Sequence, residues 1–390
     1  HLVNMRRARR LVQVGRGLVQ QRRSIKTTAQ HISPENAWTT TCVFSSDGEA
    51  FEPWQKAFAP LGVTLLPYQQ AIQNPTAIQF AAVWAPAPGA LSPFPQLRGI
   101  FNLGAGVDKI LRDPTVPTSV PLIRLRDAGM GAQMAEYCAY GVLRFHRDFD
   151  HYEARQRKRE WRQEPGGAVA AGDRNVGVLG AGVLGKRVAR TLVDLGFSVR
   201  TWSRTPPKTP SESEPPPRRT WTACHGPTFE GPAFDAFLSG LDVLVNLLPL
   251  TPATTGLLDA RLFRKLPRGA ALVNAGRGAH IVTHDLLVAL DSGSLRGALL
   301  DVFDPDEPLP PDHPLWTHPR VTVTPHVAAQ TVPTAAAAQI ADAMRQWGCL
   351  CDDHHHFFGE SESDPAYSAT HTTLPHPSSS SSETTTTTTR

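Results

Sequence analysis

A glycine-rich segment at 180–185, Gly-Ala-Gly-Val-Leu-Gly, has the residue types and spacing of a dinucleotide-binding turn. It follows an apolar stretch at 175–179 and opens a segment at 184–195 whose apolar residues recur at helical spacing. The first glycine permits a tight turn, the second lets the backbone approach a pyrophosphate, and the third allows close packing of helix on strand. The N–H groups at the start of such a helix favour phosphate, so the segment predicts a dinucleotide site.

The type of dinucleotide is read where the next strand ends, at Trp202-Ser203-Arg204. An NAD site carries Asp or Glu at this point, which accepts a hydrogen bond from the ribose 2′-OH. This chain has no acid there, and a hydroxyl beside a guanidinium suits a 2′-phosphate. NADP(H) is therefore predicted in preference to NAD(H).

Three further polar residues follow strand candidates in the second half of the chain. Arg277 comes directly after the apolar segment 270–274, and His326 after 321–324. Glu307 lies in an acidic stretch that follows a third such segment. Open α/β sheets bind ligands at the carboxyl ends of their strands, so the three side chains are expected to meet. Together they could hold a 2-keto acid, tune a proton donor and protonate an alkoxide.

The elements that must position these residues alternate between strand and helix along two blocks of the chain. Such alternation gives parallel sheets covered on both faces, so an α/β fold of two doubly wound lobes is predicted. Strand candidates lie at 41–44, 63–66, 81–84 and 99–103 in the first block, and at 176–179, 198–202, 241–247, 270–274, 298–302 and 321–324 in the second. Helix candidates lie at 52–59, 133–159, 184–195, 233–238, 260–266 and 284–290.

Nine segments in a fixed order make the chain resemble the D-isomer-specific 2-hydroxyacid dehydrogenases, and more narrowly their NADPH-dependent glyoxylate/hydroxypyruvate reductase branch. The resemblance covers roughly residues 40–347 and implies a Rossmann-type dinucleotide-binding domain, a flavodoxin-like substrate domain and a homodimer. The matching segments are VWAPAP (83–88), LGAGVDKIL (103–111), RLRDAGMGAQMAEY (124–137), VGVLGAGVLG (176–185), WSR (202–204), NAGRG (274–278), LDVF (300–303), HPLW (313–316) and TPHVAA (324–329).

The resemblance also implies a role for each site residue. NADPH would reduce glyoxylate to glycolate or hydroxypyruvate to D-glycerate, with Arg277, Glu307 and His326 as catalytic residues and His326 as general acid. The substrate would be bound by Trp84, Gly104, Ala105, Gly106, Val107 and Arg277. The cofactor would be bound by Gly180, Gly182, Val183, Leu184, Gly185, Trp202, Ser203, Arg204, Leu248, Pro249, Ala275, Arg277, Asp301 and His326.

The assignment of the acid departs from the family pattern. In most relatives the Glu stands five residues after the Asp of LDVF, and that position is Asp306 here. Glu307 stands six residues after Asp301, but it directly precedes Pro308, as the family Glu precedes a proline. Glu307 is favoured for this reason, and Asp306 stays an alternative.

The expected domain boundaries follow from composition and from the dinucleotide motif. A basic extension at 1–36 has the pattern of a mitochondrial transit peptide over about 5–30, and the alternatives are translated upstream sequence or a solvated tail. The substrate domain is expected at 37–130, the NADP-binding domain at 131–326 with a proline-rich insertion at 205–220, and a helix at 327–350 that returns to the substrate domain. A low-complexity tail at 351–390 is expected to be disordered.

Composition excludes several classes of protein. The net charge is +4 over 390 residues and its excess lies in the basic extension, so no nucleic-acid partner is expected. No apolar run reaches the roughly 18 residues that would span a bilayer, so a membrane protein is not expected either. The 5 cysteines are scattered, which favours a reducing compartment, with a cytoplasmic location expected unless the extension is a transit peptide. A Cys-Leu-Cys and His-His-His tract at 349–356 lacks the spacing of a zinc site, so no metal is predicted.

Two other functions stay open at this point. The C-terminal binding protein corepressors resemble the same dehydrogenases, so the chain could be a dinucleotide-sensing scaffold. It could also be an NADH-preferring reductase of bulkier 2-keto acids.

The segment at 202–204 generates a prediction about cofactor choice. NADPH should give the higher kcat/KM, and Arg204→Gln should lower kcat/KM for NADPH by about tenfold or more while changing that for NADH little, because the guanidinium is expected to contact only the 2′-phosphate. Steady-state kinetics with both cofactors measures this. Equal use of both cofactors by the unmodified protein, or a preference for NADH, would contradict it.

Overall fold

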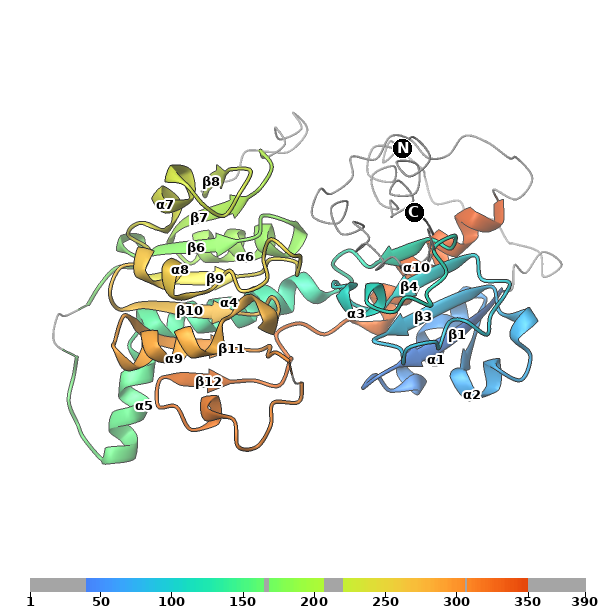
Figure 1. The fold of residues 1–390 in the computed structure, drawn as a ribbon, viewed down its shortest axis with the longest axis horizontal. Coiled ribbons are helices and arrows are strands. Elements are labelled where there is room, and N and C mark those ends of the chain that lie inside the picture. Colours follow the sequence, from blue (N-terminus) through green and yellow to red (C-terminus); the bar gives the residue numbers. More distant parts are fainter. Residues whose placement is uncertain (1–39, 165–167, 207–219, 306, 350–390) are drawn as a thin grey trace, which may run out of the picture.

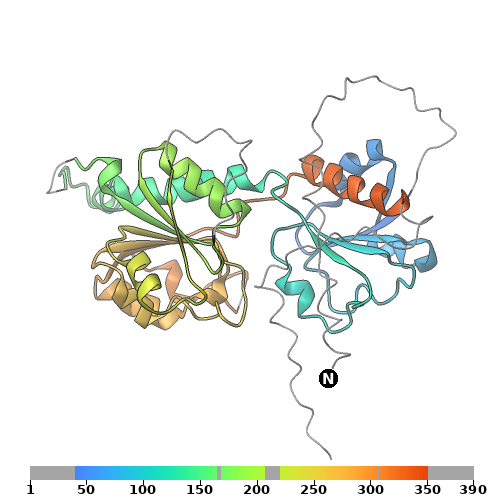
Figure 2. The same cartoon turned by 90° about the horizontal axis from the view of Figure 1, so that it is seen from above.

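The computed structural model describes residues 40–164, 168–206, 220–305 and 307–349, which form two α/β lobes side by side (Figures 1 and 2). The chain passes between the lobes twice, and the two connecting segments are tied together. Gln133 donates to the carbonyl of Gln330 at 2.7 Å, and the N–H of Gln330 donates back to the Gln133 side chain at 3.2 Å. The predicted fold class, two doubly wound α/β lobes, is confirmed.

The first lobe has a parallel sheet in the order β2-β1-β3-β4-β5, which is the flavodoxin-like order. Alternate side chains of β1 supply both faces: Cys42 and Phe44 pack under α1 (Phe51–Phe58) and α10 (Pro333–Cys349), and Val43 packs under α2 (Tyr68–Ala71) and α3 (Asp108–Leu111). The strands are β1 (Thr40–Ser46), β2 (Val63–Pro67), β3 (Phe80–Trp84), β4 (Gly99–Asn102) and β5 (Leu122–Arg124).

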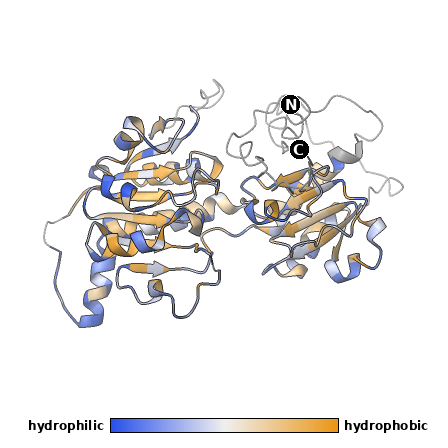
Figure 3. Cartoon of the chain, in the orientation of Figure 1, coloured by the Kyte–Doolittle hydropathy of each residue, from blue (hydrophilic) through white to orange (hydrophobic). Residues whose placement is uncertain are grey.

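The second lobe has seven parallel strands in the order β12-β11-β10-β9-β6-β7-β8, which contains the strand order of a dinucleotide-binding fold. Helices α4 (Met130–His146) and α6 (Val183–Asp194) cover one face, and α7 (Pro232–Leu238), α8 (Ala260–Lys265) and α9 (Thr283–Asp291) cover the other. The strands are β6 (Asn175–Leu179), β7 (Ser198–Ser203), β8 (Thr222–His225), β9 (Val243–Asn246), β10 (Ala270–Asn274), β11 (Leu295–Leu300) and β12 (Val321–Val323). Figure 3 shows apolar residues concentrated in the strands of both lobes.

The expected secondary structure needs correction at one helix and lacked several short elements. The segment 133–159 is not one helix: α4 ends at His146, and α5 (Phe149–Lys158) begins after Asp148, whose φ is 57°. Arg296 stabilises the turn between α4 and α5, because its guanidinium contacts the carboxylates of Asp148 at 2.7 Å and Asp150 at 2.6 Å. Strands β5 and β8 were not expected; they are short edge strands, with 3 and 4 residues.

Several expectations fall outside the described residues. They concern the basic extension and the low-complexity tail, and most of the insertion at 205–220. Across residues 40–349, apart from the short gaps, no helix has the length and apolarity to cross a membrane.

Candidate functional site

The predicted dinucleotide turn has a backbone geometry that requires glycine. Gly180 follows β6 with a φ of 102°, in the region that side chains other than glycine disfavour. A Cβ on Gly185 would lie 1.7 Å from the carbonyl oxygen of Gly180, so helix and strand could not approach. Gly182 caps α6, and a Cβ there would have nothing within 4 Å. The turn is therefore tight on its inner side and open where a pyrophosphate would lie.

The structure separates the roles of the three residues at the end of β7. The Trp202 ring is 1% exposed and packs against Phe234 and Phe237, with ring centroids 4.9 Å and 5.5 Å away. Its side chain is thus a core residue, and the expectation that it binds cofactor applies to its backbone alone. Ser203 and Arg204 come after it, partly exposed, and the Ser203 hydroxyl donates to the carbonyl of Thr205 at 2.5 Å.

The other expected cofactor residues lie along the same edge of the sheet. Leu248 and Pro249 follow β9, and Ala275 follows β10. Val183 and Leu184 form the first turn of α6, where the side chain of Val183 is exposed. All of these lie at the carboxyl ends of the parallel strands, where this class of fold binds ligands.

His326 and Glu307 are joined by a hydrogen bond. The Nδ1 of His326 lies 2.9 Å from one carboxylate oxygen of Glu307, whose other oxygen accepts from the N–H of Phe303 at 3.0 Å. Burial alone would raise the pKa of Glu307, but the hydrogen bonds from His326 and Phe303 and the charges of His326 and Lys109 lower it below its ordinary value. The pair leaves Nε2 of His326 as the ring nitrogen for a reacting group. Asp306, the alternative acid, lies outside the described residues.

Asp301 holds the turn that carries His326. The Asp301 carboxylate is 1% exposed and accepts from the N–H groups of Val327 and Ala328, each at 2.8 Å, and from the hydroxyl of Thr324 at 2.7 Å. Its backbone carbonyl accepts from the N–H of His326 at 3.0 Å. These bonds fix His326 at a φ of 55°, which is strained for a side chain other than glycine. Asp301 therefore holds the turn of His326, and its expected contact with the cofactor stays a prediction.

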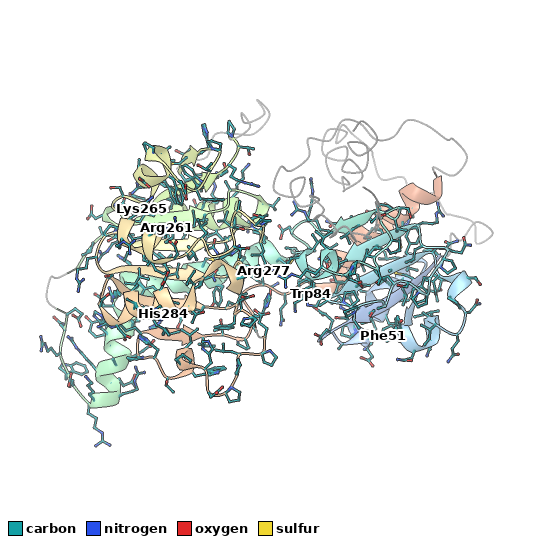
Figure 4. The ribbon with its side chains drawn as sticks, in the orientation of Figure 1. Phe51, Trp84, Arg261, Lys265, Arg277 and His284 are labelled. Atoms are coloured by element: carbon teal, nitrogen blue, oxygen red, sulfur yellow. The ribbon has the colours of Figure 1, made fainter. Side chains whose placement is uncertain are left out.

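Arg277 reaches from the second lobe to the first. Its Nε donates to the carboxylate of Asp108 at 3.0 Å, and Nη1 donates to the carbonyl of Gly276 at 2.7 Å. Nη2 occupies the space beside Gly106, where a Cβ would lie only 1.5 Å from it. Figure 4 shows Arg277 and Trp84 at the adjoining ends of the two lobes. The sequence indicated Arg277 but gave no signal for Asp108 as its partner.

A buried asparagine fixes the conformation of the loop at 104–107, which the resemblance assigns to the substrate carboxylate. Asn102, at the end of β4, donates to the carbonyls of Gly104 at 2.7 Å and Gly106 at 2.9 Å. Within the described part of the chain, no backbone N–H of residues 104–107 donates a hydrogen bond. Such N–H groups can donate hydrogen bonds to a bound anion.

A single cleft of about 120 Å³ between the lobes joins these groups. Trp84, Asn102, Gly106 and Asp108 line it from the first lobe, and Arg277, Glu307 and His326 from the second. The Trp84 ring also packs on Gly104, and a Cβ on Gly104 would lie 2.1 Å from an atom of that ring. The predicted catalytic residues therefore meet in one place, and Trp84 forms part of the wall opposite.

A buried polar network that sequence reasoning missed fixes the backbone of Arg277. Asn246, Asn274 and His280 are all 0% exposed. The Arg277 N–H donates to Nδ1 of His280 at 3.2 Å, so Nδ1 is an acceptor and the Nε2–H donates to the carbonyl of Pro249 at 3.3 Å. Asn246 also donates to Nδ1, at 2.8 Å. His280 thus connects the loop of Arg277 with the loop of Pro249, and only its burial, which a lone His in a sequence does not reveal, could have indicated it.

Comparison with known proteins gives a consistent result. Residues 140–328 match the family model described as "D-isomer specific 2-hydroxyacid dehydrogenase, NAD binding domain". The chain is 50% identical over 273 residues to glyoxylate/hydroxypyruvate reductase A of Photorhabdus laumondii, covering 68% of this chain and 82% of that protein.

Solved structures are similar as well. A D-isomer specific 2-hydroxyacid dehydrogenase from Xanthobacter autotrophicus, in complex with NADPH and MES, has a TM-score of 0.72 and 36% identity, over 80% of this chain and 96% of that one. An NADPH-dependent glyoxylate/hydroxypyruvate reductase from Sinorhizobium meliloti, in complex with NADP and sulfate, has a TM-score of 0.70 and 35% identity, over the same shares.

The environment of His280 generates a prediction about stability and pH. Burial lowers the pKa of His280 from 6.5 to about 4. Below pH 6.5 the unfolded chain takes up a proton at this residue and the folded chain does not, so stability falls as the pH drops toward 4. At about 1.4 kcal/mol per pKa unit, the loss is about 3 kcal/mol.

Urea unfolding of the unmodified protein and of His280→Gln between pH 7 and 4.5 measures this. The variant should be less stable at pH 7, by about 1–3 kcal/mol, and should lose less stability on acidification. Equal slopes against pH in the two proteins would contradict the assignment.

Proposed function

The chain belongs to the D-isomer specific 2-hydroxyacid dehydrogenase family, and from this premise we propose that it reduces glyoxylate to glycolate and hydroxypyruvate to D-glycerate with NADPH. The observation that carries the proposal is the meeting of Arg277 with the His326–Glu307 pair in one cleft at the carboxyl edge of a dinucleotide-binding sheet. The curated relative and the Sinorhizobium structure, both named as glyoxylate/hydroxypyruvate reductases, support it.

The residues of the turn at 180–185 fit a dinucleotide. Gly182 leaves open space at the N-terminus of a helix of 12 residues, where N–H groups can bind the pyrophosphate. Ser203 and Arg204 would bind the 2′-phosphate, and the NADP and NADPH bound in the two structural relatives support this choice. When bound, the nicotinamide supplies the hydride that the keto carbon accepts.

The chain's own residues handle the substrate anion and the proton. The free N–H groups of the loop at 104–107 and the Nη2 edge of Arg277 would bind the carboxylate and polarise the carbonyl. As negative charge develops on the keto oxygen, Nε2 of His326 donates its proton to that oxygen, and the product is the 2-hydroxy acid. Glu307 favours the imidazolium form of His326 through its charge and holds the ring by the bond to Nδ1.

A homodimer and a cytoplasmic location are further parts of the proposal. Exposed aromatic side chains gather along α4, α5 and the segment after them, at Tyr140, Phe149, Tyr152 and Trp161, and a second copy could bury them. Three of the cysteines, Cys42, Cys138 and Cys224, are free thiols, as is typical of proteins in a reducing compartment.

One prediction decides between the two candidate acids. Glu307→Gln should shift the pH at which reduction declines to a lower value, because the imidazolium loses its negative partner. Asp306→Asn should leave that pH profile unchanged. The measurement is kcat/KM for glyoxylate between pH 5 and 9. The opposite pattern would transfer the role to Asp306.

Another prediction separates an enzyme from a dinucleotide-sensing scaffold. His326→Ala should reduce kcat by about 10²–10⁴-fold while NADPH still binds, since general acid catalysis contributes about that much. Arg277→Ala should raise KM and lower kcat together, because Arg277 holds the carboxylate and polarises the carbonyl. NADPH fluorescence titration and turnover assays measure both. Tight NADPH binding without reduction of any small 2-keto acid by the unmodified protein would favour the scaffold.

A further inference from the structure

We propose that Lys109 and Arg112 form a second anion-binding subsite in the cleft, which selects 2-keto acids that carry a second negatively charged group. The inference rests on the proposed function and names its substrate class more narrowly. A carboxylate or a phosphate at the far end of the substrate would satisfy the same chemistry.

The charges that line the cleft are of two kinds. Arg277 and His326 already have partners within the protein, Asp108 at 3.0 Å and Glu307 at 2.9 Å. Lys109 and Arg112 line the same cleft, and among the described residues neither side chain makes an ion pair or a hydrogen bond. These two cations are thus available to a ligand.

The neighbouring acids do not neutralise the two cations. The carboxylate of Asp113, next to Arg112 in the chain, accepts from the N–H of Gly89 and from Thr115, each at 2.9 Å or less. Asp304 lines the opposite wall but lies within 4.0 Å of no described cation.

The backbone places the two cations on one side of a single helical turn. Lys109 lies in α3 and Arg112 caps it, three residues later, a spacing that puts side chains on the same face. Two like charges at this spacing repel each other, and one anionic group bound between them would offset the repulsion. Arg112 offers a planar fork that matches a carboxylate or phosphate, and Lys109 adds a point charge.

The subsite lies next to the reacting groups. The loop at 104–107, which would hold the keto acid's own carboxylate, leads directly into α3. The charge of Lys109 reaches Glu307, the partner of His326, and contributes to the lowered pKa of Glu307. A short substrate could therefore place one anionic group at Arg277 and the loop, its carbonyl at His326, and its second anionic group at Lys109 and Arg112.

The test compares matched substrates in the unmodified protein and in Lys109→Gln/Arg112→Gln, with NADPH as hydride donor. Glyoxylate is paired with ketomalonate, which adds a carboxylate, and hydroxypyruvate is paired with its 3-phosphate ester. The unmodified protein should show a kcat/KM about tenfold higher for at least one of the two acids that carry a second anionic group than for its parent. The double variant should lose this preference and keep its glyoxylate kcat/KM within about threefold of the unmodified value. Ketomalonate alone responding would identify a carboxylate site, and the phosphate ester alone a phosphate site.

A charge-matched control separates local binding from general attraction. Lys56→Gln/Arg264→Gln removes two exposed cations, from α1 and α8, and should leave all four kcat/KM values unchanged. If Lys109→Gln/Arg112→Gln lowered kcat/KM equally for the parent acids and for the acids with a second anionic group, the two cations would attract any anion, and the subsite would be overturned. The subsite would also be overturned if the unmodified protein reduced glyoxylate and hydroxypyruvate but showed no preference for either acid with a second anionic group. If none of the four acids is reduced, the proposed function itself fails.

Discussion

The contact between Arg277 and Asp108 is the interaction on which the candidate site depends, because it joins the lobe that would bind the cofactor to the lobe that would bind the substrate carboxylate. The Nε of Arg277 is committed to Asp108 and Nη1 to Gly276, so Nη2 is directed at the loop beside Gly106. Neither lobe alone has this arrangement. An ion pair that bridges two lobes also makes the site sensitive to their separation, as expected where closure must exclude water from a hydride transfer.

Buried polar groups at the carboxyl ends of the strands hold the reacting side chains in place. Asp301 fixes the turn of His326, and the Asn246–Asn274–His280 network fixes the backbone of Arg277. Burying such groups costs free energy unless their hydrogen bonds are made, and here most of them are. Asp301 and the Asn246–Asn274–His280 network bond to the backbone that carries His326 and Arg277. The strained φ of His326 persists because the hydrogen bonds around it hold the backbone in that conformation.

The sequence predicted the parts of the fold that rest on local pattern and missed those that rest on contacts far apart in the chain. The alternation of strands and helices and the turn at 180–185 are local, and both lobes follow from them. The break before α5 depends on Arg296, which lies about 150 residues away from Asp148. For the same reason the position of His326 could be expected but its dependence on Asp301 could not, and Trp202, read as a cofactor residue from its motif, proves to be a core side chain.

The pairing of charges in the cleft explains how one site can hold both a strong cation and a proton donor without ligand. Arg277 and His326 share the cleft, and each has its own acid partner. Arg277 contacts Asp108 through Nε, and His326 contacts Glu307 through Nδ1, which leaves Nη2 of Arg277 and Nε2 of His326 without these partners. In the proposed reaction the substrate carboxylate would meet Nη2 of Arg277 and the N–H groups at 104–107, so it would not need to displace either acid. On this proposal the cleft is organised for an anion before the anion binds, which lowers the cost of reorganisation during the reaction.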